Sequence, residues 1–132
     1  METRRQHISS GTKWEAAVGY SRAVRVGSII HVSGTTATDA GGNIVGVGDP
    51  YVQTMQAIMN IESALLQLES CLEEVVRTRI YVKNIGDWEK IGAAHAKFFE
   101  RTRPATSMVE VNRFIDTDIL VEIEAEAISF SR

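Results

Sequence analysis

The chain has 132 residues, of which 44% are hydrophobic and 23% charged, and its formal net charge is −3 at pH 7. This composition excludes a disordered chain, and the length predicts one domain that spans residues 1–132. The acidic balance argues against nucleic acid as a partner, and no apolar run approaches the roughly 20 residues that span a membrane. The single cysteine, Cys71, excludes an internal disulfide, and the polar lead carries no secretory signal, so we expect a cytoplasmic protein.

The first third of the chain predicts an antiparallel meander. Residues 7–9 suit an edge strand, and residues 20–34 alternate as two β segments with Gly27 and Ser28 at the turn between them. A second turn follows in the Ala-Gly-Gly-Asn sequence of residues 40–43. We therefore expect these strands to be neighbours in an antiparallel arrangement.

The clearest element is a helix that begins after Asp49. Asp49 suits the cap position, and Pro50 suits the first helical position, where its missing N–H would be unpaired in any case. Apolar side chains then recur at three- and four-residue spacing and predict one broad buried face, formed by Met55, Ile58, Met59, Ile61, Leu65, Leu66 and Leu68. We interpret the methionines as core-filling residues, and we expect the helix to end within residues 69–72.

A strand at residues 75–83 and a second helix follow. The strand has two faces, one with Val76, Thr78, Ile80 and Val82 and the other with Val75, Arg77, Arg79 and Tyr81. Asp87 suits the cap of the second helix, which ends near Arg101, ahead of Pro104. The apolar side of this helix carries Ile91, His95, Phe98 and Phe99. This order of elements predicts an α+β fold with both helices on one face of the sheet.

The C-terminal region, residues 103–128, predicts two more strands joined by a short polar turn. In the second of them, residues 119–128, apolar side chains alternate with Glu122, Glu124 and Glu126. Three carboxylates on one face require water, cations or a partner surface. We expect them on the sheet face away from the helices, with Arg77, Arg79, Tyr81, Met108, Glu110, Leu120 and Ile128. The mixed character of this face favours cross-strand Arg–Glu pairs and burial between subunits over plain solvation.

Four segments carry a resemblance to a known family. They are G-Y-S-R-A-V-R-V-G-S-I-I-H-V-S-G-T (19–35), Y-V-K-N-I-G-D-W (81–88), R-P-A-T-S-M-V-E-V (103–111) and V-E-I-E-A-E-A-I (121–128). Over residues 17–130 the chain resembles the RidA/YjgF family, the reactive-intermediate deaminases, also labelled endoribonuclease L-PSP. The resemblance implies a chorismate-mutase-like fold with a mixed sheet packed on two helices. It also implies a homotrimer whose sheets form a central barrel, with three ligand clefts between subunits.

The family resemblance implies hydrolysis of enamines and imines to a 2-oxo acid and ammonia, without a cofactor. In members that do this, an arginine after Pro-Ala clamps the substrate carboxylate with two parallel hydrogen bonds. This chain has Thr106 after Pro104 and Ala105, and Met108 where the family has a cysteine. Losing such a charged clamp costs about 2–5 kcal/mol of binding. We therefore predict weak or absent activity on 2-imino acids, unless Arg22, Arg25, Arg101 or Arg113 compensates.

The rest of the family's cleft is retained in this sequence. By resemblance, Tyr20 would close over the ligand, the backbone at Ser33 and Gly34 would line the pocket, and Glu122 would hold the attacking water as a general base. From the residues alone, Tyr20 could equally be an interface aromatic, Gly34 a turn residue and Glu122 the partner of a sheet arginine. Thr106 and Met108 complete the predicted substrate-binding set.

Three functions remain open from the sequence. The chain could be a divergent RidA-type hydrolase with an altered substrate, a trimer that binds a metabolite without catalysis, or an RNA-directed endoribonuclease or translation inhibitor. The third is the weakest, because the chain is acidic and lacks an aromatic stacking platform. His7, His31 and His95 show no metal-ligand spacing, so we expect no metal site and a small metabolite as the partner.

Overall fold

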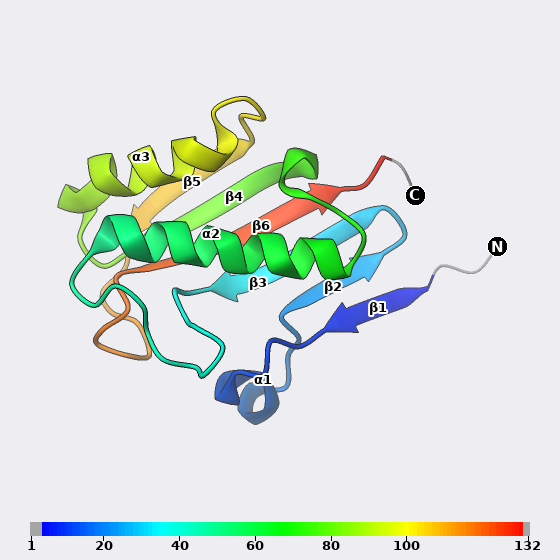
Figure 1. Cartoon of the computed structure of the whole chain (residues 1–132), viewed down its shortest axis with the longest axis horizontal. Coiled ribbons are helices and arrows are strands. Elements are labelled where there is room, and N and C mark those ends of the chain that lie inside the picture. The colour runs from blue at the N-terminus through cyan, green and yellow to red at the C-terminus, as the bar shows by residue number, and fades with distance from the viewer. Residues whose placement is uncertain (1–3, 131–132) are drawn as a thin grey trace.

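The computed structural model describes residues 4–130, and within them six strands form one sheet in the order β1-β2-β3-β6-β4-β5 (Figure 1). The strands are β1 (Arg5–Ile8), β2 (Ala23–Val26), β3 (Ile29–Thr35), β4 (Val75–Val82), β5 (Ala105–Glu110) and β6 (Val121–Ile128). The predicted meander is confirmed, since β1, β2 and β3 pair antiparallel in sequence order. Residues 1–3 and 131–132, the two ends of the predicted domain, lie outside the described residues.

The prediction of a short turn between the last two strands is wrong. β4 lies between β5 and β6, pairing parallel with β5 and antiparallel with β6, which makes the sheet mixed. Parallel neighbours need a crossover connection, and the helix between β4 and β5 supplies it. The chain of residues 111–120 then carries β6 back to the other side of β4.

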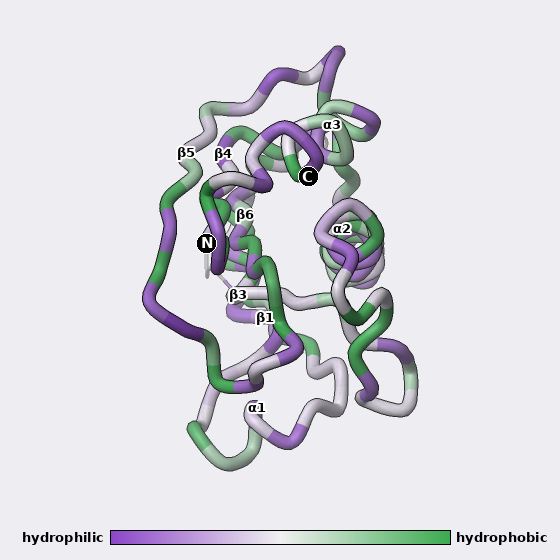
Figure 2. Tube along the Cα trace, turned by 90° about the vertical axis from the view of Figure 1, so that its left-hand side faces the viewer, coloured by the Kyte–Doolittle hydropathy of each residue, from purple (hydrophilic) through white to green (hydrophobic). Residues whose placement is uncertain are grey.

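Both long helices cover one face of the sheet, as predicted: α2 (Pro50–Gln67) and α3 (Trp88–Phe99) lie on the same side in Figure 2. The cap of α2 is confirmed, because the Asp49 side chain accepts a hydrogen bond from the Val52 N–H at 3.1 Å. Asp87 occupies the predicted N-cap position of α3, although its side chain does not bond to the start of the helix. A 3₁₀ turn, η2 (Ile85–Asp87), precedes α3, and the Asn84 side chain caps that turn while Asp87 makes no capping hydrogen bond.

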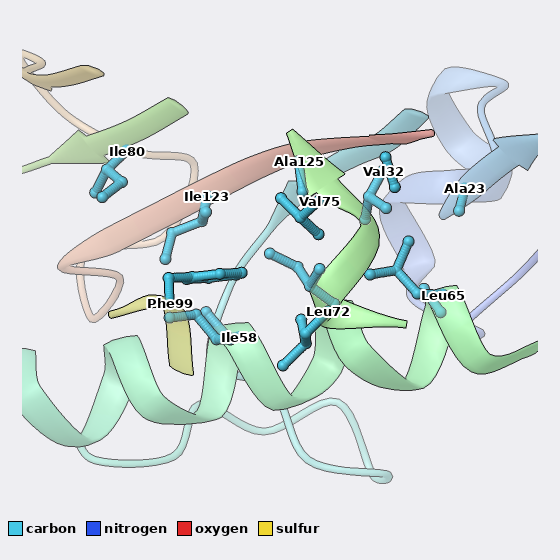
Figure 3. Close-up of a cluster of buried hydrophobic side chains, with 14 of the residues drawn as sticks. Ala23, Val32, Ile58, Leu65, Leu72, Val75, Ile80, Phe99, Ile123 and Ala125 are labelled. Atoms are coloured by element: carbon cyan, nitrogen blue, oxygen red, sulfur yellow. The ribbon is translucent and has the colours of Figure 1, made fainter. Parts of the chain in front are cut away.

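The core lies between α2, α3 and the sheet. Figure 3 shows Phe99 of α3 and Ile58 and Leu65 of α2 directed at Ile123 and Val32 of the sheet. The buried face of α2 is rotated from the predicted one. It consists of Pro50, Gln53, Thr54, Ala57, Ile58, Ile61, Ala64 and Leu65, and the buried Leu68 follows at the C-cap. Met59 and Leu66 lie on the outer side of the helix, 43% and 60% exposed, because the face that carries Ala57, Ile58 and Leu65 is turned towards the sheet. The core-filling role predicted for Met59 is therefore wrong.

The faces of β4 and β5 differ from the prediction in two places. A bulge between Val75 and Arg77 inverts the start of β4, so Val75 is buried and Val76 is 39% exposed. In β5, the parallel register pairs Thr106, Met108 and Glu110 with Thr78, Ile80 and Val82 of the helix-covered face. Met108 and Glu110 therefore do not lie on the open face. Met108 packs against the core, and Glu110 accepts a hydrogen bond from the Ile85 N–H at 2.9 Å.

The open face of the sheet carries the predicted charge ladder. β4 and β6 place Arg79 opposite Glu124, and Arg79 Nη1 lies 3.8 Å from Glu124 and 3.5 Å from Glu126. The Tyr81 hydroxyl donates to Glu124 at 3.2 Å, and the His31 ring lies 3.3 Å from Glu126. Cross-strand pairing is thus confirmed for the carboxylates farther along β6, and Glu122 stands at the end of the row.

Among the helices of residues 4–130, none combines the length and the apolar character needed to cross a bilayer.

Candidate functional site

A cleft of about 820 Å³ opens at the end of the sheet where β3, β6 and the N-terminal segment meet. Tyr20, Gly34 and Glu122, three of the predicted site residues, line it, together with Arg22. Residues of the loop that follows β3, of one flank of α2 and of the segment before β6 complete its wall. Its volume is that of a typical small-molecule site.

Glu122 projects into this cleft from the open face of β6. Its side chain is half-buried, and among residues 4–130 it has no hydrogen-bond or ion-pair partner. Burial raises the pKa of the Glu122 carboxyl, the neighbouring charge of Glu124 raises it further, and Arg22 lowers it. The pKa of this carboxyl is therefore shifted upwards, in the direction that suits a general acid or base at neutral pH.

Gly34 makes the space for this carboxylate. A bulge in β3 sets Ser33 and Gly34 opposite one residue of β6, because Val32 pairs with Ala125 and Thr35 already pairs with Ile123. A Cβ atom on Gly34 would overlap the Glu122 carboxylate and lie 2.9 Å from its Cδ. A side chain at position 34 would therefore displace the Glu122 carboxylate from its place, so glycine here leaves room for that carboxylate.

Arg22 forms the buried floor beside Glu122. Its five N–H groups meet five acceptors: Nε donates to Ser10 Oγ (3.2 Å), Nη1 to Gly34 O (2.6 Å) and Thr35 Oγ1 (3.3 Å), and Nη2 to Glu15 Oε2 and Tyr20 OH (both 3.5 Å). The Tyr20 ring also lies under the guanidinium, 5.6 Å from its carbon. Arg22 therefore fixes the positions of both Tyr20 and the Gly34 backbone.

Glu15 is the counter-charge of Arg22. Its side chain is 5% exposed and accepts hydrogen bonds from the Ser10 N–H, from the Ser10 hydroxyl and from Thr12 Oγ1 at 2.9 Å. Burial alone would raise its pKa, but hydrogen bonds from Ser10, Ser9 and Thr12 and the charge of Arg22 lower the pKa to about 2. Glu15 is thus a structural carboxylate that is ionised at neutral pH.

The helix that carries Glu15, α1 (Lys13–Val18), was not predicted from the sequence. It has six residues and ends at Gly19, whose φ of 91° is in the left-handed region. The sequence does hold a signal for it, because Thr12 and Glu15 form the Thr-x-x-Glu pattern of a helix start. In the structure these two side chains bond to each other, and they turn the carboxylate towards Arg22.

Comparison with known proteins identifies the family. The family model described as endoribonuclease L-PSP matches residues 11–129. The chain belongs to this family, the RidA/YjgF family. A crystal structure of a YjgF/YER057c/UK114 family member from Mycobacterium tuberculosis is similar at 47% identity and a TM-score of 0.86, covering 95% of this chain and 99% of that one. An uncharacterized protein of Streptomyces coelicolor is 38% identical over 122 residues, 92% of this chain and 90% of its own.

Members of the family with lower sequence identity are similar over most of the chain as well. A RutC family protein of Pyrococcus abyssi is 34% identical over 108 residues, which cover 82% of this chain and 84% of that protein. The crystal structure of the YjgF gene product of Escherichia coli is similar at 27% identity with a TM-score of 0.80. The resemblance drawn from the four sequence segments is therefore confirmed, and so is the YjgF-type α+β fold.

In this RidA/YjgF chain the remaining predicted site residues lie apart from the cleft. Ser33 donates its hydroxyl hydrogen bond to the Ser21 carbonyl at 2.7 Å and lines an adjoining hollow of about 380 Å³. Thr106 and Met108 are on β5, the edge strand at the far side of the sheet, and line neither cavity. One chain therefore brings together Tyr20, Gly34 and Glu122 only.

Thr106 belongs to a chain of polar contacts under α3. Its Oγ1 lies 2.8 Å from the Thr78 hydroxyl, which is itself 3.0 Å from His95 Nε2, and the Thr106 hydroxyl donates to the Pro104 carbonyl at 3.1 Å. Burial lowers the pKa of the His95 ring, which favours its neutral form. Within residues 4–130, no group of three or more histidine, cysteine, aspartate or glutamate side chains is placed to hold a metal ion.

Proposed function

We propose that this protein is a RidA-type deaminase that hydrolyses an imine other than the usual 2-imino acids, with Glu122 as the general base. The observation that carries the proposal is the half-buried, unpaired Glu122 carboxylate in a cleft of small-molecule size. Membership of the family supports a small-molecule role. The raised pKa of Glu122 supports acid–base work, because a base is most effective when its pKa lies near the operating pH.

The proposed reaction needs one carboxylate that exchanges one proton. Glu122 accepts a proton from water as the water oxygen bonds to the imine carbon, and it passes that proton to the imine nitrogen, which gives a carbinolamine. Glu122 next takes the proton of the carbinolamine hydroxyl and delivers it to the nitrogen, so the C–N bond breaks, ammonia leaves and the carbonyl forms. Atoms balance as imine plus water giving carbonyl compound plus ammonia. Tyr20, held by Arg22 at the mouth of the cleft, covers the ligand.

We further propose that the active form is a homotrimer in which β5 of one subunit closes the cleft of the next. In support, the open sheet face carries exposed Val76 and Val109 beside the charge ladder, which is a mixed surface of the kind that subunits bury. In this arrangement Thr106 and Met108 would complete a cleft that one chain leaves open.

The testing experiment compares two imine sources. An amino-acid oxidase generates 2-imino acids, and an amine oxidase generates imines without a carboxylate; semicarbazide then traps whatever imine survives. We expect the natural protein to reduce trapping only for the second class, and Glu122→Gln to lose at least about a hundredfold of that rate. Thr106→Arg is expected to gain activity on 2-imino acids, whereas the matched control Thr106→Val, which adds no donor, is not.

Two results would overturn the proposal. One is a natural protein that accelerates hydrolysis of neither imine class, which would favour the alternative of a metabolite-binding trimer without catalysis. The other is undiminished hydrolysis by Glu122→Gln, which would remove the base assigned here. Cleavage of RNA would be the third function, and the row of three glutamates on the open face argues against it.

A further inference from the structure

We propose that the cleft selects ligands that carry a cationic nitrogen group, such as an amidinium or iminium, and no carboxylate, with Glu122 as the counter-charge. The inference rests on the proposed function to the extent that it assigns the ligand class of the same cleft. Three observations carry it: all five N–H groups of Arg22 are engaged within the chain, Thr106 brings no charge, and Glu122 has no ion-pair or hydrogen-bond partner among residues 4–130.

Arg22 has no donor left for a ligand carboxylate. A guanidinium has five N–H groups, and all five are directed at acceptors of this chain, with Glu15 neutralising the charge. Arg22 therefore does not replace the clamping arginine that the family resemblance leads one to expect at position 106. Arg25 is committed too, because it donates to the carbonyls of Gly27 and Leu68 at 2.8 and 2.7 Å.

Thr106 brings no charge for a ligand carboxylate. Its hydroxyl contacts the Pro104 carbonyl at 3.1 Å and the Thr78 hydroxyl at 2.8 Å, where either oxygen can be the donor. In the proposed trimer, Thr106 therefore offers a neutral hydroxyl where the family resemblance leads one to expect a charged, two-pronged clamp.

Glu122 supplies the negative charge of the cleft. The wall also carries one other cation, Lys13, whose ammonium lies 5.5 Å from the centre of the Trp14 ring, and one other carboxylate, Asp39, so these two charges cancel in the formal count. Once Glu15 has neutralised Arg22, Glu122 remains as the uncompensated group. A cationic nitrogen would gain a charge-assisted hydrogen bond from a carboxylate that has no partner within residues 4–130.

The test uses three planar ligands of equal size: benzamidine, which is cationic, benzamide, which is neutral, and benzoate, which is anionic. Their dissociation constants would be measured by titration calorimetry at pH 7.5 on the full-length protein in its native assembly. We expect benzamidine to bind at least about tenfold more tightly than benzoate, with benzamide between them. Glu122→Gln should remove this preference.

Two variants sharpen the measurement. Glu126→Gln is the matched control, because it makes the same change on the same face of β6 but lies outside the cleft, where its partners are His31 and Arg79. It should leave the preference for benzamidine intact. Glu15→Gln leaves the Arg22 charge uncompensated and should raise the affinity for benzoate several-fold.

Tighter binding of benzoate, a benzamidine preference that survives in Glu122→Gln, or no saturable benzamidine binding at millimolar concentration would each overturn the inference. Its failure is separable from that of the proposed function because binding needs no turnover. A protein that prefers benzamidine but hydrolyses no imine contradicts only the proposed function. A protein that hydrolyses imines but prefers benzoate contradicts only the ligand class.

Discussion

Glu15 and Glu122 lie near the same cleft, and their surroundings shift their pKa values in opposite directions. Burial opposes the charge of both carboxylates. At Glu15, hydrogen bonds from Ser10, Ser9 and Thr12 and the charge of Arg22 outweigh burial and lower the pKa to about 2. At Glu122 no such donors are present among the described residues, so burial and the charge of Glu124 raise the pKa and outweigh the lowering effect of Arg22. A buried carboxylate whose charge is balanced by hydrogen bonds and a cation, such as Glu15, is structural, whereas one without such partners, such as Glu122, is a candidate for reactivity.

The largest loss of stability is expected when Glu15 loses its counter-charge, Arg22. Arg22→Met would leave Glu15 charged and buried, and it would also deprive the Gly34 carbonyl of its 2.6 Å donor. We expect the free energy of unfolding to fall by about 3–5 kcal/mol, the usual cost of breaking a buried ion pair on one side. Urea denaturation at pH 7 measures it.

Arg79→Met is the control for that measurement. Arg79 pairs with Glu124 and Glu126 on the open face, where the three side chains are 30–37% exposed, so its loss in the isolated subunit should cost about 0–1 kcal/mol. Equal losses for Arg22→Met and Arg79→Met would contradict the assignment of Glu15 and Arg22 as a buried structural pair.

A second test measures how the stability contributed by the Glu15–Arg22 pair depends on pH. The pKa of Glu15 is lower in the folded protein than its ordinary value of 4.5, so its stabilising contribution is present above pH 4.5 and is lost as the pH falls towards about 2. Between pH 5 and 2 the natural protein should lose about 2–3 kcal/mol more stability than Glu15→Gln, which has no carboxyl to protonate. Parallel pH profiles of the two proteins would show that Glu15 is not held in this way.

Helices and strands with a regular apolar pattern were predicted from the sequence. Predictions were wrong where the strand partners or the buried face depend on how distant segments pack together. In β6 the alternation of glutamates with Ile123, Ala125 and Ala127 is unambiguous, because one face is fully buried. The edge strand β5 buries little and has small polar residues, so its alternation did not show that its partner is β4 or that Met108 faces the core.

The candidate site divides in the same way. Glu122, Gly34 and Tyr20 were found because sequence segments around them resemble the family's, and the structure places them on one cleft. Arg22 was considered only as one of several arginines, because its five acceptors come from four separate stretches of chain. Glu15 was missed, since α1 is too short for an apolar period to reveal it.

The smallest effect on stability, and the opposite sign, is expected at Glu122. The pKa of Glu122 is higher in the folded protein than its ordinary value, so folding disfavours the charged form of this side chain. The free energy of unfolding therefore falls as the pH rises through the folded-state pKa and Glu122 becomes charged. Glu122→Gln should therefore raise the free energy of unfolding at pH 8 by a few tenths of a kcal/mol, up to about 1 kcal/mol. The gain should shrink as the pH falls below the pKa of Glu122, because the natural side chain then becomes neutral as well. Urea denaturation of both proteins at pH 8 and pH 4.5 measures this difference, and a loss of stability at pH 8 would show that Glu122 is a compensated structural carboxylate like Glu15.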